Sequence, residues 1–199
     1  MFKLFCVTSR SLCRKDFLSR LEEIARAGVD GILLREKDLS PAQYRILAEQ
    51  ALDCCASYGV PCVLHSFADV AAELEAEALH LPLPVLEKLE PKVRRRFHRL
   101  GASCHSVAEA VRAQTLGCTY VTAGHIFETD CKLGLPGRGL KFLTEVCQAV
   151  SIPVCAIGGI SAENLAAVRD AGAAGACVMS GPMTCEDPVD YFAALRRVL

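Results

Sequence analysis

The sequence predicts a compact (β/α)8 TIM barrel formed by a single domain, residues 1–199. Eight short apolar runs alternate with amphipathic segments, and the repeat of about 25 residues is typical of one strand and one helix of such a barrel. Each run is apolar at odd and even positions alike, as expected for parallel strands covered on both faces. A doubly wound open sheet is the alternative, but its first turn is Gly-rich, whereas the first turn here reads Thr8-Ser-Arg-Ser11.

The expected strands are four or five residues long. They span Leu4–Thr8, Gly31–Leu34, Cys62–His65, Ala78–Leu81, Leu100–Ser103, Tyr120–Gly124, Val154–Ile157 and Ala176–Met179.

Start signals for helices follow several of these strands. Ser40-Pro41 places a capping residue before a proline at the first helical position. Ser106-Val-Ala-Glu109 has the form of a capping box, and Ser161-Ala-Glu-Asn164 is expected to open a helix that ends at Gly172. The fourth unit is the weakest, because Leu81-Pro-Leu-Pro84 leaves little room for a full helix.

Composition and charge exclude several classes of protein. The chain has 22 Lys and Arg against 23 Asp and Glu, a formal net charge of −1, so no global positive field would hold nucleic acid or an anionic membrane. A hydrophobic fraction of 52% and a mean hydropathy of +0.29 argue against disorder. No apolar run reaches the roughly 18 residues of a membrane span, and the brief apolar start meets Arg10 and Arg14, which is not the pattern of a signal peptide. We therefore expect a cytoplasmic protein whose 12 cysteines are reduced and mostly act as small apolar groups.

The clearest functional signal lies after the last two strands, because the active sites of barrels lie at the carboxyl ends of the strands. Gly158-Gly159 lets the backbone approach a ligand closely, and Ser180-Gly181 offers further amides from the neighbouring strand. Barrels often bind phosphate at this place. We therefore expect these four residues to hold a phosphate group; the alternative is that Gly159 only ends a strand.

The segment Ile126–Gly139 is long for a connection between strand and helix, and long loops at this face are often lids or binding segments. Its Lys132 and Arg138 supply cations for an anionic ligand, unless they are the solvated charges of a plain surface loop. His125 stands directly before the segment, and an imidazole with an ordinary pKa near 6.5 suits proton transfer at neutral pH. A hydrogen-bonded structural histidine is the alternative.

Two other candidate sites carry weaker signals. His65, His80 and His105 end or follow successive strands, where neutral imidazoles can bind zinc. Their spacing matches no known zinc signature, so structural histidines are the preferred interpretation. Cys131 is a candidate nucleophile without a specified base nearby.

Several motifs together resemble one known family. The string Gly124-His-Ile-Phe-Glu-Thr-Asp-Cys-Lys132 with Gly137-Arg-Gly139 resembles the TenI-type thiazole tautomerases, which are relatives of thiamine phosphate synthase. The resemblance continues in chain order through Leu34-Arg-Glu-Lys37, Ala102-Ser-Cys-His-Ser106, Ala156-Ile-Gly-Gly-Ile160 and Val178-Met-Ser-Gly181. It covers nearly the whole chain.

The resemblance implies an isomerase of thiamine biosynthesis, which aromatises 2-carboxy-thiazol-5-ylidene ethyl phosphate to carboxythiazole ethyl phosphate. His125 would carry the proton, and the glycine loops would anchor the phosphate. The resemblance also implies a homodimer without a cofactor. The remaining candidates for binding the substrate are Arg35, Lys37, Ser103, Lys132 and Arg138.

Metal chemistry separates the two branches of this family. The synthase branch couples a pyrimidine pyrophosphate to a thiazole phosphate with Mg²⁺, which an Asn-Asp pair after strand three and an Asp after strand four hold. This sequence has His65-Ser66 at the first place and no carboxylate before Glu87 at the second. Imidazole and hydroxyl groups do not replace carboxylates around Mg²⁺. The sequence therefore favours a metal-free tautomerase; the synthase and a non-catalytic phosphate sensor are the alternatives.

Overall fold

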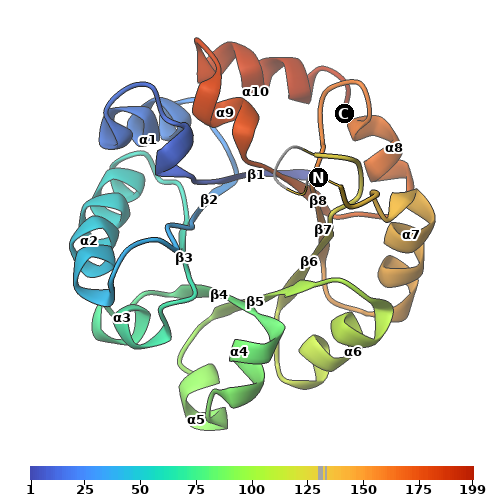
Figure 1. Cartoon of the computed structure of the whole chain (residues 1–199), viewed down its shortest axis with the longest axis horizontal. Helices are drawn as coiled ribbons and strands as arrows, with labels where there is room; N and C mark the ends of the chain where they lie inside the picture. Colours follow the sequence, from blue (N-terminus) through green and yellow to red (C-terminus); the bar gives the residue numbers. More distant parts are fainter. Residues whose placement is uncertain (130–131, 133) are drawn as a thin grey trace.

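Eight parallel strands close into a barrel in which each strand pairs with its neighbours in sequence and β8 pairs with β1 (Figure 1). The computed structural model describes residues 1–129, 132 and 134–199. The predicted (β/α)8 barrel is confirmed, with strand boundaries within one residue of those expected. The strands are β1 (Lys3–Val7), β2 (Gly31–Leu34), β3 (Cys62–His65), β4 (Ala78–Pro82), β5 (Arg99–Cys104), β6 (Tyr120–Gly124), β7 (Val154–Ile157) and β8 (Gly175–Val178).

Helices form a ring around the strands (Figure 1). The short fourth unit carries two small helices in place of one long helix. The helical elements are η1 (Arg10–Leu12), α1 (Phe17–Arg26), α2 (Pro41–Ser57), α3 (Ala68–Glu73), α4 (Leu83–Lys88), α5 (Pro91–Arg94), α6 (Val107–Thr115), α7 (Gly139–Ala149), α8 (Leu165–Asp170), α9 (Ser180–Thr184) and α10 (Pro188–Arg196).

Two of the three predicted helix starts are found where the sequence places them. Ser40 caps α2 through a reciprocal pair of bonds with Gln43, and the side chain of Ser106 accepts a hydrogen bond from the backbone of Glu109 at the start of α6. The third prediction is wrong by one turn, because α8 begins at Leu165 and not at Ser161. The backbone N–H of Ser161 is bonded to the side chain of Asn164, so this stretch forms a turn before the helix.

The apolar core has two layers. Most of it lies between the strands and the helices, where fully buried side chains include Leu4, Ile32, Tyr44 and Phe192. A second, smaller cluster fills the inside of the barrel, as expected for a barrel whose interior is packed. It contains Val7, Leu33, Val63, Ala78, Cys155 and Cys177. Every cysteine in the described part of the chain is free.

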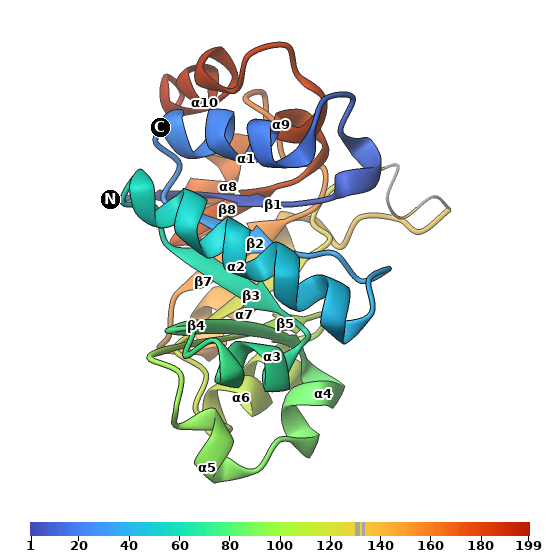
Figure 2. The ribbon, with the colours of Figure 1, turned by 90° about the vertical axis from the view of Figure 1, so that its left-hand side faces the viewer.

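The two ends of the barrel differ. Both termini lie at one end, and the described part of the connection between β6 and α7 extends from the other (Figure 2). Among the described residues, no helix has the length and apolar character needed to cross a bilayer.

The hydroxyl of Tyr44 joins two strands to helix α2 inside the core. It donates to the backbone carbonyl of Leu34 at 2.7 Å and accepts from the backbone N–H of His65 at 2.9 Å. Because Tyr44 is fully buried, these two backbone groups would have no water to replace the lost hydroxyl.

We therefore expect Tyr44→Phe to lower the free energy of unfolding by about 1–3 kcal/mol, measured by urea denaturation. The matched control is Tyr58→Phe, since Tyr58 is 40% exposed and its loss should change stability by less than about 0.5 kcal/mol. Equal effects of the two substitutions would contradict this role of Tyr44.

Candidate active site

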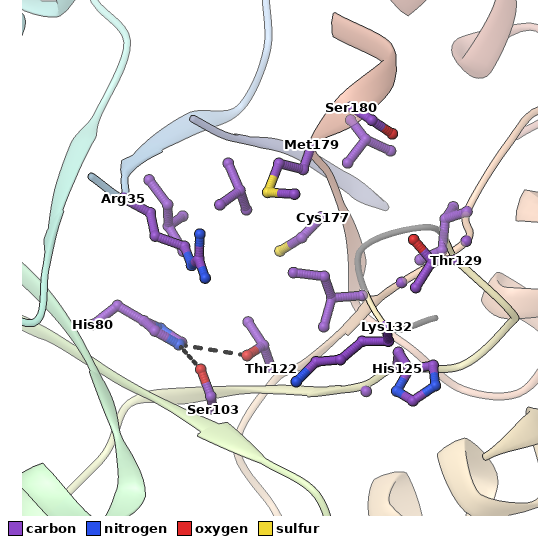
Figure 3. A pocket seen from close by; sticks show the side chains of 18 of the residues that line it. Arg35, His80, Ser103, Thr122, His125, Thr129, Lys132, Cys177, Met179 and Ser180 are labelled. Carbon is purple, nitrogen blue, oxygen red and sulfur yellow. Dashed lines mark hydrogen bonds between the residues drawn. The ribbon is translucent and has the colours of Figure 1, made fainter. Parts of the chain in front are cut away.

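A cavity of about 300 Å³ opens where the carboxyl ends of the strands meet (Figure 3). Its size is at the lower end of the range of small-molecule sites. All of the predicted site residues except Arg138 line it: Arg35, Lys37, Ser103, His125, Lys132, Gly158, Gly159, Ser180 and Gly181.

Three cations share this cavity. Arg35 and Lys37 follow β2, and Lys132 reaches in from the connection between β6 and α7. In Figure 3 the guanidinium of Arg35 and the amine of Lys132 both point into the cavity. None of the three has a carboxylate partner among the described residues. Desolvation, followed by repulsion from Arg35 and Lys132, lowers the pKa of Lys37 from its usual 10.5. The cavity is therefore prepared for an anion.

Glu36, between Arg35 and Lys37 in the sequence, does not line the cavity and braces the backbone. Glu36 is 3% exposed; it accepts from the hydroxyl of Thr8 at 2.6 Å and from the backbone N–H of Arg10 at 3.0 Å. Thr8 in turn accepts from the backbone N–H of Arg35 at 2.9 Å. Burial raises the pKa of Glu36, and the bonds from Thr8 and Arg10 oppose that rise. This chain of bonds ties the loop after β1 to the loop after β2 and so holds Arg35 at the cavity.

The glycine pair after β7 presents unpaired backbone donors. Gly158 and Gly159 have φ values of +100° and +65°, which favour glycine. A Cβ on Gly158 would lie against His125, and one on Gly159 against the backbone of Glu128, so the loop after β6 is what excludes side chains here. The N–H groups of Gly159 and Ile160 have no hydrogen-bond partner among the residues described.

One side chain holds this loop in shape. Asn164 accepts from the backbone N–H of Ser161 at 3.0 Å and donates to the carbonyl of Gly159 at 2.8 Å. The peptide unit of this carbonyl also contains the N–H of Ile160, which points the opposite way, so the bond from Asn164 leaves the N–H of Ile160 for the cavity. Ser180 and Gly181, at the start of α9, complete the same wall.

His125 and Arg138 form hydrogen bonds that the sequence does not indicate. His125 is half-buried at the rim, and its Nε2 donates to the carbonyl of Leu135 at 3.2 Å. Arg138 lies outside the cavity lining, and its Nε donates to the carbonyl of Gly124 at 3.1 Å. That carbonyl also accepts from Nδ1 of His105 at 2.9 Å. Arg138 and His105 therefore brace the end of β6.

Buried imidazoles form part of the cavity floor. His65 and His80 are 4% and 1% exposed, and their rings stack with centroids 5.6 Å apart. Burial and neighbouring positive groups lower the pKa of His65 to about 2 and that of His80 to about 3. Both rings are neutral at physiological pH. The sequence alone favours a structural role for both, although the alternation of side chains along β4 places His80 inside the barrel.

The chain matches the family model described as thiamine monophosphate synthase over residues 4–181. It belongs to the thiamine monophosphate synthase family. A thiamine-phosphate synthase 2 of Streptococcus pneumoniae is 35% identical over 189 residues, covering 93% of this chain and 89% of that protein. A thiamine-phosphate synthase of Syntrophomonas wolfei is 32% identical over 204 residues, covering 99% and 96%.

A solved structure is also similar over nearly the whole chain. Thiamine phosphate pyrophosphorylase from Pyrococcus furiosus superposes with a TM-score of 0.86 at 28% identity, covering 99% of this chain and 95% of that one.

These findings overturn the tautomerase expectation. The similar proteins are named synthases, which are transferases, so the transferase alternative is favoured and the isomerase assignment is wrong. The expectation depended on the resemblance of the motifs to the TenI-type family, on one imidazole and on missing metal ligands. The structure gives a physical reason for the error at the imidazole, since Nε2 of His125 is already bonded to its own loop.

The cavity does not fit the Mg²⁺ site that the synthase branch implies. Mg²⁺ takes oxygen ligands and favours carboxylates, but no carboxylate lines the described part of the cavity, and no group of three possible metal ligands occurs among the described residues. His65 stands at the place of the first ligands, and Pro82, the last residue of β4, stands at the second, while three cations would repel a divalent ion. Cys131, the candidate nucleophile, lies outside the described residues.

The neutral histidines predict how stability depends on pH. Their pKa values in the folded protein lie below the ordinary 6.5, so below pH 6.5 the unfolded chain binds more protons than the folded protein. The free energy of unfolding should therefore fall as the pH drops from about 6.5 toward 3, by about 1.4 kcal/mol per pH unit for each neutral histidine. Urea denaturation between pH 7 and pH 5 should give a shallower slope for His65→Gln and an unchanged slope for His98→Gln on the surface. Identical slopes in wild type and His65→Gln would argue against this assignment.

The brace on the glycine loop predicts a binding defect. Asn164→Ala removes both bonds, so the peptide unit between Gly159 and Ile160 is free to turn its carbonyl instead of the N–H of Ile160 toward the cavity. We expect the dissociation constant for inorganic phosphate, measured by calorimetry, to rise about fivefold, the equivalent of about 1 kcal/mol. Gln148→Ala, an exposed change on α7, should leave it unaltered. Equal affinities for wild type and Asn164→Ala would show that the brace has no part in anion binding.

Proposed function

We propose that this chain is a thiamine-phosphate synthase that couples a pyrimidine, carried as its pyrophosphate, to a thiazole phosphate. One observation carries the proposal: in a member of this family, a single cavity is lined by three cations without a carboxylate partner, and by a loop with unbonded amides, among the described residues. Two separate anion sites suit two phosphorylated substrates. The names of the relatives support the same reaction.

Arg35, Lys37 and Lys132 are assigned to the pyrophosphate. As the bond between the pyrimidine and pyrophosphate breaks, negative charge grows on the leaving group. Cations that are in place beforehand stabilise this charge more in the transition state than in the bound substrate, which raises the rate. No step is assigned to a metal ion, because the described residues offer no ligands for it.

The phosphate of the thiazole is assigned to the opposite wall. Gly158, Gly159, Ser180 and Gly181 supply backbone amides and a hydroxyl there. With both anionic ends held, the two rings lie together in the space between, so that binding energy from groups that do not react orients those that do. His125 and Ser103 line this space as contacts for the substrates.

The assay is the formation of thiamine phosphate from the two substrates by the purified protein. We expect product and pyrophosphate in equal amounts. Lys37→Gln and Lys132→Gln should each lower kcat/KM about 10- to 1000-fold. The matched control is Lys141→Gln, since Lys141 is 92% exposed on α7, and its activity should be unchanged.

The outcomes separate the synthase from a sensor. If inorganic pyrophosphate raises the melting temperature but saturating substrates give no product with or without added Mg²⁺, the chain binds phosphate ligands without turnover and the proposal is wrong. Loss of activity in Lys141→Gln equal to that in Lys37→Gln would refute the roles of the cavity cations.

A further inference from the structure

The register of three neighbouring strands places a tyrosine beneath the cavity floor. His80 on β4 lies opposite Gly101 on β5, which lies opposite Tyr120 on β6. Two residues further along, the same pairing sets Ser103 beside Thr122. Because side chains alternate along a strand, these positions form two consecutive layers facing the inside of the barrel. Tyr120 belongs to the lower layer and does not line the cavity.

Gly101 makes contact possible between the strands on either side of it. A Cβ at this position would lie 2.5 Å from Nδ1 of His80 and would overlap the ring of Tyr120. The missing side chain leaves the space in which these two rings meet, with centroids 5.4 Å apart. The hydroxyl of Tyr120 reaches Nδ1 of His80 at 3.0 Å.

The direction of this hydrogen bond follows from the chemistry of its two ends. Burial raises the pKa of Tyr120 well above 10, so its oxygen keeps the proton. That hydroxyl has no other hydrogen-bond partner among the described residues. A phenol is a stronger donor than a neutral imidazole N–H, and an imidazole nitrogen is a stronger acceptor than a phenol oxygen. Tyr120 therefore donates and Nδ1 accepts.

The other nitrogen of His80 must then carry the ring hydrogen, because a neutral imidazole has one donor and one acceptor. Nε2 lies 2.9 Å from the hydroxyl of Ser103 and 3.4 Å from that of Thr122, as the dashed lines in Figure 3 show. Nε2–H donates to Ser103, whose own hydrogen is left for the cavity. In the opposite tautomer Ser103 would donate to Nε2 and could offer the cavity only lone pairs.

We propose that Tyr120 is a positioning residue which, acting through His80, makes the hydroxyl of Ser103 a hydrogen-bond donor to the substrate. The group that Ser103 recognises is a lone-pair acceptor, either a ring nitrogen of a heterocycle or an oxygen of a phosphate group. Only the identity of that substrate rests on the proposed function. The tautomer and its dependence on Tyr120 are properties of the ligand-free protein.

The first experiment therefore needs no substrate. Nitrogen-15 NMR of labelled histidine side chains at neutral pH reports which nitrogen carries hydrogen, and His80→Gln identifies the signals of His80. We expect hydrogen on Nε2 in the wild type and a shift toward Nδ1 in Tyr120→Phe. Tyr58→Phe, which removes a surface hydroxyl, should leave the signals unchanged. Hydrogen on Nδ1 in the wild type, or no change in Tyr120→Phe, overturns the proposal.

The second experiment measures the consequence for binding. In the coupling assay, Tyr120→Phe should raise KM for one substrate about tenfold, a loss typical of one hydrogen bond to a buried group, while kcat changes less than threefold. Ser103→Ala should raise KM of the same substrate, and the double variant should be no worse than Ser103→Ala alone, because the two act through one bond. Additive losses overturn the proposal.

A third measurement separates the two acceptors. If Tyr120→Phe also weakens binding of inorganic pyrophosphate, Ser103 contacts a phosphate oxygen; if it does not, Ser103 contacts a ring nitrogen, and both results support a donor at Ser103. If the wild type forms no thiamine phosphate, the proposed function fails while the NMR result still decides the tautomer.

Discussion

The hydrogen-bonded register of the closed parallel barrel decides which side chains of this protein can meet. Neighbouring strands are held in fixed alignment, so residues far apart in sequence become members of one inward-facing layer. An apolar cluster that includes Val7, Leu33 and Cys177 fills the inside of the barrel. The polar floor formed by His80, Ser103 and Thr122 lines the cavity that opens at the carboxyl ends of the strands.

The charges around the cavity make it a site for anions. Cations line it without carboxylate partners among the described residues, and the imidazoles beside them are neutral because burial and positive neighbours oppose their charging. The nearest acid in sequence, Glu36, is used to brace two loops. A site with this arrangement favours anionic groups over a divalent cation, and that preference follows from which side chains face inward.

Individual site residues did not predict the reaction correctly. The resemblance of the motifs to the TenI-type family, His125 and the missing metal ligands favoured a tautomerase, whereas the relatives that match over nearly the whole chain are named synthases. A histidine at the end of a strand has the right chemistry for proton transfer, but its neighbours decide whether the ring is free. Here the ring of His125 is bonded to the carbonyl of Leu135 in the loop that follows it, a contact that no spacing in the sequence indicates.

The amino-acid sequence by itself determined the barrel, its strand boundaries to within one residue, and nine residues of the cavity lining. Apolar runs and turn signals are local features, so they predict strands and turns directly from the sequence. The location of barrel sites at the carboxyl ends of strands is a general rule, so it predicts the site once the strands are known. Only the tertiary structure decided that Arg138 braces Gly124, that α8 begins at Leu165, and that Tyr120 meets His80 across Gly101. Each of these depends on register and on the packing of loops against one another, which join residues distant in sequence.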